Sequence, residues 1–348
     1  MRKIGQYFLK IATSIGLSFA ATLLFATIVA LRHKITTPLP LKSSLPGDDH
    51  LYRWQYGHIF YKTSGDRNSP PLLLLHTPSI DGSAHEMRYI AEALAHDYYV
   101  YAPDLPGFGF SDRLHIDYSA EMYISFCRDF LAQVIGKPAF VLASMLSCNY
   151  AVIVAQENPD LCSHLILISP TELYHAPYDN SSDLSPGLSS GNKRQASLLT
   201  RIVQRPLVQF YLFPLLTTRT ALRFSLARQR PGTDTADIDY RYATTHQFGA
   251  ELAPMAMLAG KLTVDATQQF DALKQPTLII WGARGLNNTR IHTHSIGRSD
   301  TTTYTEVVLI QDAGLYIHEE HPEMVLANIR EWLEAESTAK DTDSSNKL

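Results

Sequence analysis

The residues best placed to do chemistry lie between positions 140 and 159, in the stretch FVLASMLSCNYAVIVAQENP. An apolar run leads into small residues that open a helical pattern, which predicts a strand, a sharp turn and a helix. Such a turn can present one side chain above a sheet if small residues stand two positions before and two after it. Here Ala143 and Ser147 are the small pair, and the residue between them is Met145. A thioether has no proton to give up and is not a nucleophile toward esters.

Ser144 is an alternative nucleophile, one residue before Met145. His318 follows the last predicted strand and could serve as its base, while Glu172 follows another strand and could supply the acid. Ser144 would, however, place Leu142 and Leu146 at the two positions where small residues are needed. We keep Ser144, His318 and Glu172 as a relocated triad, with hydrogen bonding in a loop as the other role open to His318.

The composition is that of a folded domain and excludes several classes of function. The chain has 348 residues, 45% hydrophobic and 18% charged, and its formal net charge of -4 gives no case for a nucleic-acid partner. The 3 cysteines show no CxxC spacing, so neither a zinc site nor a disulfide framework is indicated. We expect no cofactor and no metal.

The N-terminal region has the pattern of a membrane anchor. A basic segment, residues 1–10, precedes residues 11–31, which carry no charged side chain and match the roughly 20 residues that cross a bilayer. We expect an uncleaved transmembrane signal anchor and a single-pass membrane location, with cleavage as the alternative. Basic residues on both sides leave the orientation open. Residues 32–50 suit a linker, and polar residues 335–348 suit a disordered tail.

The region between these ends alternates between strand and helix patterns. Such alternation predicts a mostly parallel central sheet with helices on both faces, formed by residues 51–169 and 272–334. We expect strands at residues 58–62, 71–76, 98–102, 139–143, 165–169, 277–281 and 305–310, and helices at 84–95, 120–135 and 323–333.

Residues 170–271 interrupt this alternation and read as a loop followed by short helices. An insertion between two strands would lie above the carboxyl ends of the sheet, so we expect a helical cap. Part of the insertion has basic residues and no acidic ones. These residues either face water or contact anionic lipid, and near a lipid surface each would contribute about 1 kcal/mol of binding free energy. They are Lys193, Arg194, Arg201, Arg205, Arg219, Arg223, Arg228 and Arg230.

Three further motifs follow predicted strands. Residues 104–111 read DLPGFGFS, residues 76–78 read HTP, and residues 314–322 read GLYIHEEHP. Together with the stretch 140–159, they resemble the motifs of the α/β-hydrolase family of esterases and lipases, and the resemblance covers about residues 58–333. It implies the α/β-hydrolase fold and an oxyanion hole formed by the backbone N–H groups of Thr77 and Leu146.

The resemblance fails at the three positions of the family's catalytic triad. The serine aligns with Met145, the acid with Gly285 and the histidine with Leu315. We therefore expect a non-catalytic protein of this fold that binds an apolar or lipid-like ligand beneath the cap or acts as a partner subunit. A divergent ester hydrolase that uses Ser144 and His318, and a structural interaction module at the membrane, are the alternatives.

Overall fold

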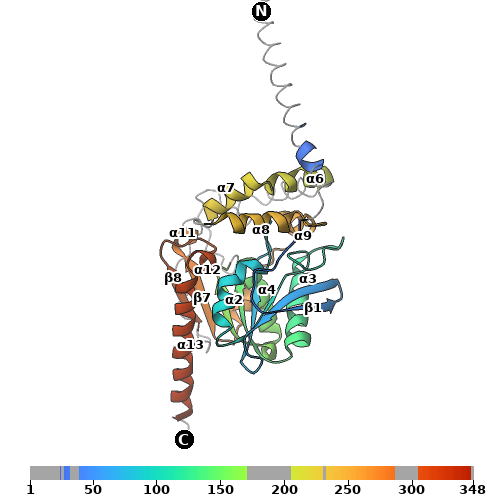
Figure 1. The fold of residues 1–348 in the computed structure, drawn as a ribbon. Helices are drawn as coiled ribbons and strands as arrows, with labels where there is room; N and C mark the ends of the chain where they lie inside the picture. The colour runs from blue at the N-terminus through green and yellow to red at the C-terminus, as the bar shows by residue number, and fades with distance from the viewer. Residues whose placement is uncertain are drawn as a thin grey trace, which may run out of the picture.

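The structure is a computed structural model that describes residues 24, 27–31, 39–170, 205–229, 233–286 and 305–345. Its central feature is a sheet with the order β1-β2-β4-β3-β5-β6-β7-β8 in the described part of the chain (Figure 1). β1 and β2 run antiparallel to their neighbours, and the strands from β4 to β8 are parallel. The strands are β1 (Asp48–Trp54), β2 (Gly57–Ser64), β3 (Pro71–Leu75), β4 (Tyr99–Pro103), β5 (Ala139–Ser144), β6 (Cys162–Ile168), β7 (Thr277–Gly282) and β8 (Thr305–Ile310).

Buried apolar runs explain why the parallel strands lie at the centre. Every residue of β3 is buried, as expected of a strand covered on both faces. Because successive side chains point to opposite faces, Val141 of β5 joins the core on one side of the sheet and Leu142 the core on the other. The sequence therefore predicted the parallel sheet correctly.

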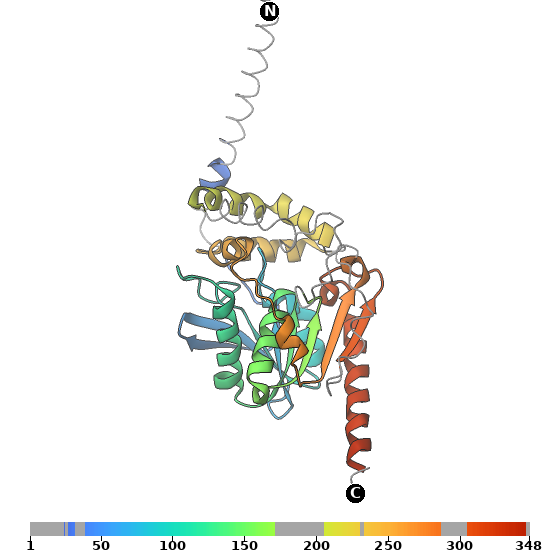
Figure 2. The ribbon, with the colours of Figure 1, turned by 180° about the vertical axis from the view of Figure 1, so that it is seen from behind.

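Helices cover both faces of the sheet (Figures 1 and 2). The core on one face includes residues of α3 and α4, and the core on the other includes residues of η1, α2, α12 and α13. The helices of this part are η1 (Ala84–Met87), α2 (Arg88–Leu94), α3 (Ala120–Phe130), η2 (Leu131–Ile135), α4 (Leu146–Glu157), η3 (Pro159–Leu161), α11 (Ala283–Leu286), α12 (Ile317–Glu320) and α13 (Pro322–Ser345).

A helical cap lies across one end of the sheet, as the insertion predicted (Figure 2). Its described helices are α6 (Pro206–Leu216), α7 (Arg219–Gln229), α8 (Thr235–Thr245) and α9 (Leu252–Leu258). Helix α10 (Thr267–Asp271) follows them in the chain and packs against α4 of the core. Of the basic residues singled out in the sequence, four lie outside the described residues, and Arg205, Arg219, Arg223 and Arg228 are exposed. Contact with anionic lipid stays a prediction.

The predicted transmembrane segment needs correction. Residues 11–31 lie mostly outside the described residues, and no helix in the part of the chain that the structure describes is long and apolar enough to cross a membrane. The described end of the segment packs on the protein itself, because Ala30 is fully buried and the Thr27 hydroxyl lies 3.4 Å from that of Tyr211. A run without charges is necessary for a membrane span but does not make one, so the expected single-pass membrane location is wrong.

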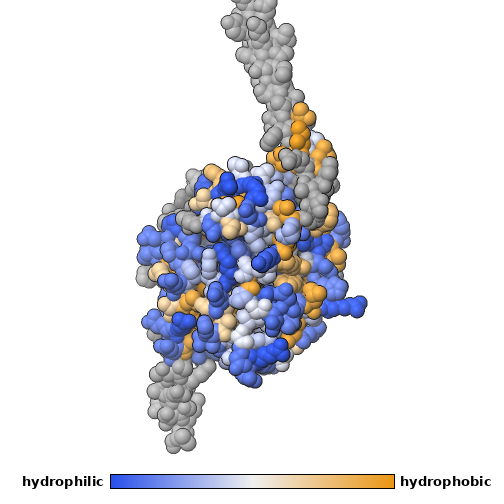
Figure 3. All heavy atoms as spheres, viewed as in Figure 1, coloured by the Kyte–Doolittle hydropathy of each residue, from blue (hydrophilic) through white to orange (hydrophobic). Residues whose placement is uncertain are grey.

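Apolar side chains are also exposed near this contact between the N-terminal segment and α6. Figure 3 shows orange surface at the junction, and the exposed residues there are Leu24, Ile28, Leu31 and Leu207.

Both ends of the folded region differ from the expected linker and tail. Strand β1 was missed because residues 32–50 were assigned to the linker, and it pairs with β2 along its whole length. The preceding segment is held in place as well, since the Leu39 carbonyl accepts a 2.7 Å hydrogen bond from Gln247 and Leu45 is buried. Helix α13 continues to Ser345, through residues where we expected a disordered tail.

A buried ion cluster joins the cap to the core. We call Asp81, Arg88, Asp237, Arg241 and Glu319 the seam cluster. Arg241 of α8 is fully buried and lies 3.0 Å from Asp81, 3.0 Å from Asp237 and 2.7 Å from Glu319. Arg88 of α2 lies 2.8 Å from the same Glu319. Burial by itself lowers the pKa of Arg241, but the three carboxylates outweigh it and hold that pKa well above its usual value.

Removing Arg241 should destabilise the protein strongly. Arg241→Leu leaves the buried carboxylates of Asp237 and Glu319, and the partly buried one of Asp81, without their main cation, and breaking such a buried pair costs about 3–5 kcal/mol. Arg219→Leu is the matched control, because its partner Asp239 is half exposed and such pairs contribute less than about 1 kcal/mol. Denaturant unfolding followed by circular dichroism measures both. Equal, small losses would show that the seam cluster does not hold the cap.

Candidate functional site

The turn between β5 and α4 has the strained backbone of a nucleophile elbow. Met145 at its apex has φ 46° and ψ -116°, a region that side-chain-bearing residues rarely occupy and that costs about 1–3 kcal/mol. Two backbone bonds hold it there: Met145 N–H donates to the Ile168 carbonyl at 2.8 Å, and Cys148 N–H donates to the Met145 carbonyl at 3.1 Å. The elbow is thus fully formed, and it presents a partly exposed thioether.

A buried carboxylate lies beneath this elbow. Glu86 of η1 accepts hydrogen bonds on Oε1 from the Ser144 hydroxyl and from His318 Nε2, the latter at 3.0 Å. Its Oε2 accepts from the backbone N–H of Thr77 at 3.1 Å. We call Thr77, Glu86, Ser144 and His318 the elbow cluster, and all four are buried. Four separate elements meet there: the turn after β3, η1, the end of β5 and α12.

Ser144 and His318 come together in the elbow cluster, but both bond the same oxygen of Glu86 and not each other. In a Ser-His-acid triad the histidine bonds the serine directly and the carboxylate stands behind the histidine. Here Ser144 donates to Glu86, and His318 Nε2 is also bonded to Glu86. Ser144 is fully buried as well. The arrangement suits a fixed hydrogen-bonded cluster better than an attack on a substrate.

The oxyanion hole expected at Thr77 and Leu146 is also altered. The Thr77 N–H donates to Glu86, and Pro78 has no N–H to offer. Leu146 begins helix α4, whose first N–H groups have no partner within the helix. Of the two predicted donors, only Leu146 is left for a ligand.

The segments that follow β7 and β8 pack against each other, and they carry the positions that align with the acid and the histidine of the triad. Gly285 lies in α11, directly after β7, and Leu315 lies partly exposed between β8 and α12. A side chain on Gly282 would meet the Gly314 carbonyl at 2.1 Å, so the two loops approach closely. Neither position has an ionisable side chain. Glu172 lies outside the described residues.

The residues of the DLPGFGFS motif hold turns beside the elbow. Asp104 is buried and accepts from the backbone N–H of Ala84 at 2.7 Å and of Phe110 at 2.8 Å. Burial raises the pKa of Asp104 despite these bonds. A side chain on Gly109, which has φ 52°, would meet the Asp104 carboxylate at 2.0 Å, so this tight turn needs glycine.

His76 joins the same framework. Its Nδ1 lies 3.0 Å from the Thr77 carbonyl and its Nε2 accepts from Leu105 N–H at 3.0 Å. Burial lowers the pKa of His76 and so favours the neutral imidazole that this pattern needs.

The described residues offer neither a cluster of metal ligands nor a reactive thiol. No group of three or more His, Cys, Asp or Glu side chains there is arranged to hold a metal ion. The cysteines are free and buried, and burial raises the pKa of Cys127 and Cys148 well above the usual range, which keeps them as thiols.

Comparison with known proteins agrees with this fold. The model of the alpha/beta hydrolase fold family matches residues 70–322, most of the chain. The chain belongs to the α/β-hydrolase fold family. Uncharacterised proteins of Mycobacterium tuberculosis and Mycobacterium bovis are 31% identical to it over 102 residues, which is 29% of this chain and 29% of each relative's length.

Solved α/β-hydrolase structures cover nearly the whole fold. A serine hydrolase involved in carbazole degradation (the CarC enzyme) has a TM-score of 0.63 and 18% identity, covering 83% of this chain and 100% of its own. A membrane phospholipase A, a bacterial virulence factor, has a TM-score of 0.63 and 18% identity, with coverages of 96% and 99%. A haloalkane dehalogenase variant from Bradyrhizobium elkanii has a TM-score of 0.64 and 18% identity, with coverages of 85% and 99%. At such identities the likeness establishes the fold alone.

Glu86 is the residue that the sequence did not indicate. It stands in the first turn of an amphipathic helical pattern, where a carboxylate is common and usually solvated. Two of its three partners, Ser144 and His318, lie 58 and 232 residues away in sequence, so no local pattern could reveal its burial.

Glu86→Leu should destabilise the protein by about 3 kcal/mol or more. Three buried donors lose their acceptor, and each unsatisfied group costs about 1–3 kcal/mol. Glu86→Gln should cost less because an amide oxygen still accepts. Glu92→Leu, at an exposed position of the neighbouring helix, is the control, expected within about 0.5 kcal/mol of wild type. Denaturant unfolding gives these values, and a Glu86→Leu protein as stable as the control would contradict the role of the cluster.

Proposed function

We propose that this α/β-hydrolase-fold protein does not hydrolyse esters at its elbow and instead binds a neutral apolar ligand beneath the cap. The observation that carries the proposal is the Glu86 carboxylate, which takes up the Thr77 N–H and the His318 imidazole below an elbow that presents Met145. Nucleophile, base and one oxyanion donor are therefore all missing from the places where this fold uses them.

Magnitudes support the loss of catalysis. Without any triad member, hydrolases keep about 10³ to 10⁴-fold acceleration over water from the oxyanion hole and substrate binding. Loss of one oxyanion donor removes about 10² to 10³-fold of this. With Thr77 N–H bonded to Glu86, little acceleration is left at this elbow. The Glu86 carboxylate would also repel a developing oxyanion.

The character of the ligand follows from the side chains at these positions. Three apolar side chains that are only partly buried lie here: Met145, Leu146 and Leu315. Met145 and Leu315 stand at positions that align with the triad, and Leu146 is next to Met145. Methionine adapts its shape to irregular apolar partners. Since Glu86 lies directly below, a neutral ligand should be favoured over an anionic one of the same length.

A divergent hydrolase that uses Ser144 and His318 is the second candidate. One observation favours it: the Ser144 hydroxyl already donates to a carboxylate that also holds His318, and a carboxylate can act as a general base. Against it, Ser144 is fully buried below the elbow, with Leu142 and Leu146 on its flanks.

Ligand binding is tested by thermal unfolding with dodecanol and dodecanoate. At a concentration of about 100 times Kd, a ligand adds about 2.7 kcal/mol of stability, which raises Tm by roughly 5–10 °C in a domain of this size. We expect this rise with dodecanol and a smaller one with dodecanoate. Met145→Asp should abolish it, whereas Met324→Asp, on the exposed side of α13, should not. If neither compound shifts Tm, a structural or partner role is favoured instead.

Hydrolysis at the elbow is tested with p-nitrophenyl butyrate. We expect the rate of the wild-type protein to be unchanged in Ser144→Ala and in His318→Gln, because neither side chain reaches a substrate. A loss of about 10-fold or more in both variants, with folding intact by circular dichroism, would establish the divergent hydrolase and overturn the proposal.

A further inference from the structure

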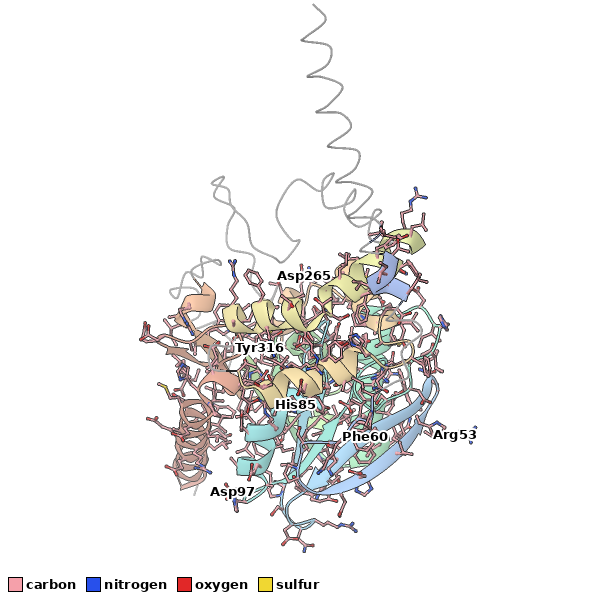
Figure 4. All side chains as sticks on the ribbon, turned by 45° about the horizontal axis from the view of Figure 1, so that its top comes forward. Arg53, Phe60, His85, Asp97, Asp265 and Tyr316 are labelled. Atoms are coloured by element: carbon pink, nitrogen blue, oxygen red, sulfur yellow. The ribbon has the colours of Figure 1, made fainter. Side chains whose placement is uncertain are left out.

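A second group of nucleophile, base and acid lies at the seam between cap and core, and it shares no residue with the elbow cluster, although its His85 directly precedes Glu86 in η1. Ser44 belongs to the segment before β1, His85 to η1 and Asp237 to cap helix α8. The Ser44 hydroxyl is hydrogen-bonded to His85 Nδ1, and His85 Nε2 lies 2.5 Å from Asp237 Oδ1. Ser44 is exposed, whereas His85 and Asp237 are buried. Figure 4 places His85 at the edge of the cap, beside the helix that carries Asp237.

We propose that Ser44 is an activated nucleophile, with His85 as its general base and Asp237 orienting that base, and that it accepts acyl or phosphonyl groups from activated esters and fluorophosphonates. This site is independent of the elbow.

The hydrogen bonds fix the tautomer that such a base needs. Asp237 also accepts from Arg241 at 3.0 Å, and an ionised carboxylate can only accept, so the proton between it and His85 belongs to Nε2. His85 Nδ1 then carries a lone pair, and the Ser44 hydroxyl donates to it. The serine proton therefore already points at the base that would take it.

The imidazole is held rigidly in this orientation. The Tyr240 ring, one turn along α8 from Asp237, stacks on His85 with a centroid distance of 4.1 Å and an interplanar angle of 22°. Arg241 fixes Asp237 from the other side. Core, cap and the segment before β1 thus all contribute, which is the pre-organisation that a reactive side chain requires.

The surrounding charges tolerate a proton on His85 for the moment of reaction. Among the described residues, the seam cluster contains three carboxylates (Asp81, Asp237 and Glu319) and two guanidinium groups (Arg88 and Arg241), a net charge of −1 that an imidazolium would neutralise. At rest, burial and the two arginines outweigh the bond to Asp237 and lower the pKa of His85 to about 4. His85 is therefore neutral, and able to accept a proton, throughout the range above pH 5.

The step at Ser44 is a simple substitution. The Ser44 oxygen forms a bond to the phosphorus of a fluorophosphonate, the P–F bond breaks, fluoride leaves, and the serine proton passes to His85 Nδ1 and on to solvent. With an activated carboxylic ester, the oxygen attacks the carbonyl carbon, the alcohol leaves with the proton from His85, and water later cleaves the acyl-serine with His85 again as base. Aid from a positioned base is worth about 10² to 10⁴-fold.

The proposal is tested by labelling the full chain with a fluorophosphonate and locating the adduct by peptide mass spectrometry. We expect the adduct on Ser44, formed at least about 100-fold faster than on Ser43. Ser43 is the matched control, since it is the preceding residue, its hydroxyl accepts from Leu45 N–H at 3.4 Å, and no histidine of the described residues is bonded to it. Ser44→Ala should remove the adduct, Ser43→Ala should keep it, and His85→Gln should slow its formation about 100-fold or more.

The pH dependence keeps the test decisive if His85→Gln folds poorly. In the wild-type protein the labelling rate should rise with pH to about pH 5 and stay level from there to pH 8, because the pKa of His85 is about 4. A serine without a base would instead react faster with each unit of pH. Absence of an adduct on Ser44, a rate that rises tenfold per pH unit, or a rate unchanged in a folded His85→Gln protein would each overturn the proposal. An adduct on Ser144 and none on Ser44 would overturn both this proposal and the non-catalytic elbow.

Discussion

The buried carboxylate of Glu86 is the interaction on which the central part of this molecule depends. It holds the turn after β3, the end of β5 and helix α12 through three hydrogen bonds. A buried charge is tolerated only when it is well paired, so these three donors and Glu86 require one another. In doing so, the carboxylate takes the Thr77 N–H, one of the two groups that we expected to form an oxyanion hole.

Met145 has the strained backbone conformation of a nucleophile elbow. A side-chain-bearing residue at φ 46° persists only where the surroundings enforce it, and here the backbone bonds to Ile168 and from Cys148 do so. The tight turns around Asp104 and the close approach of Gly282 to Gly314 are present as well. The shape of the turn therefore does not depend on the side chain at position 145. It depends on backbone hydrogen bonds, which a methionine allows as well as a serine does.

The elbow cluster and the seam cluster are both buried and charged, and they differ in character. The elbow cluster has one carboxylate and a closed set of donors, whereas the seam cluster alternates acids and arginines between cap and core. Ser44 borders the second and is exposed, whereas Ser144 is fully buried. His85 lies between Ser44 and Asp237, and the cap supplies only the second of these partners.

The sequence by itself determined the fold class. Buried apolar runs such as β3 and β5, the DLPGFGFS motif and the sharp turn at Met145 are local patterns, and local patterns reflect strand burial and backbone geometry directly. It also placed Met145, Gly285 and Leu315 at the positions that the resemblance aligns with the triad, and the absence of ionisable side chains there is readable from residue type. Two predictions failed where the local pattern was ambiguous. An uncharged N-terminal run suggested a membrane span, and the first residues of strand β1 were assigned to the linker.

Only the tertiary structure decided what Glu86, His85 and Ser44 do. Their partners lie far away along the chain, 58 residues for Glu86 and Ser144, 152 for His85 and Asp237, and 41 for Ser44 and His85. A hydrogen bond depends on distance and direction in space, and neither is encoded in the residues next to the donor. The identity of each residue was plain from the start, but its function in the molecule followed from which strand ends and cap helix the fold brings together.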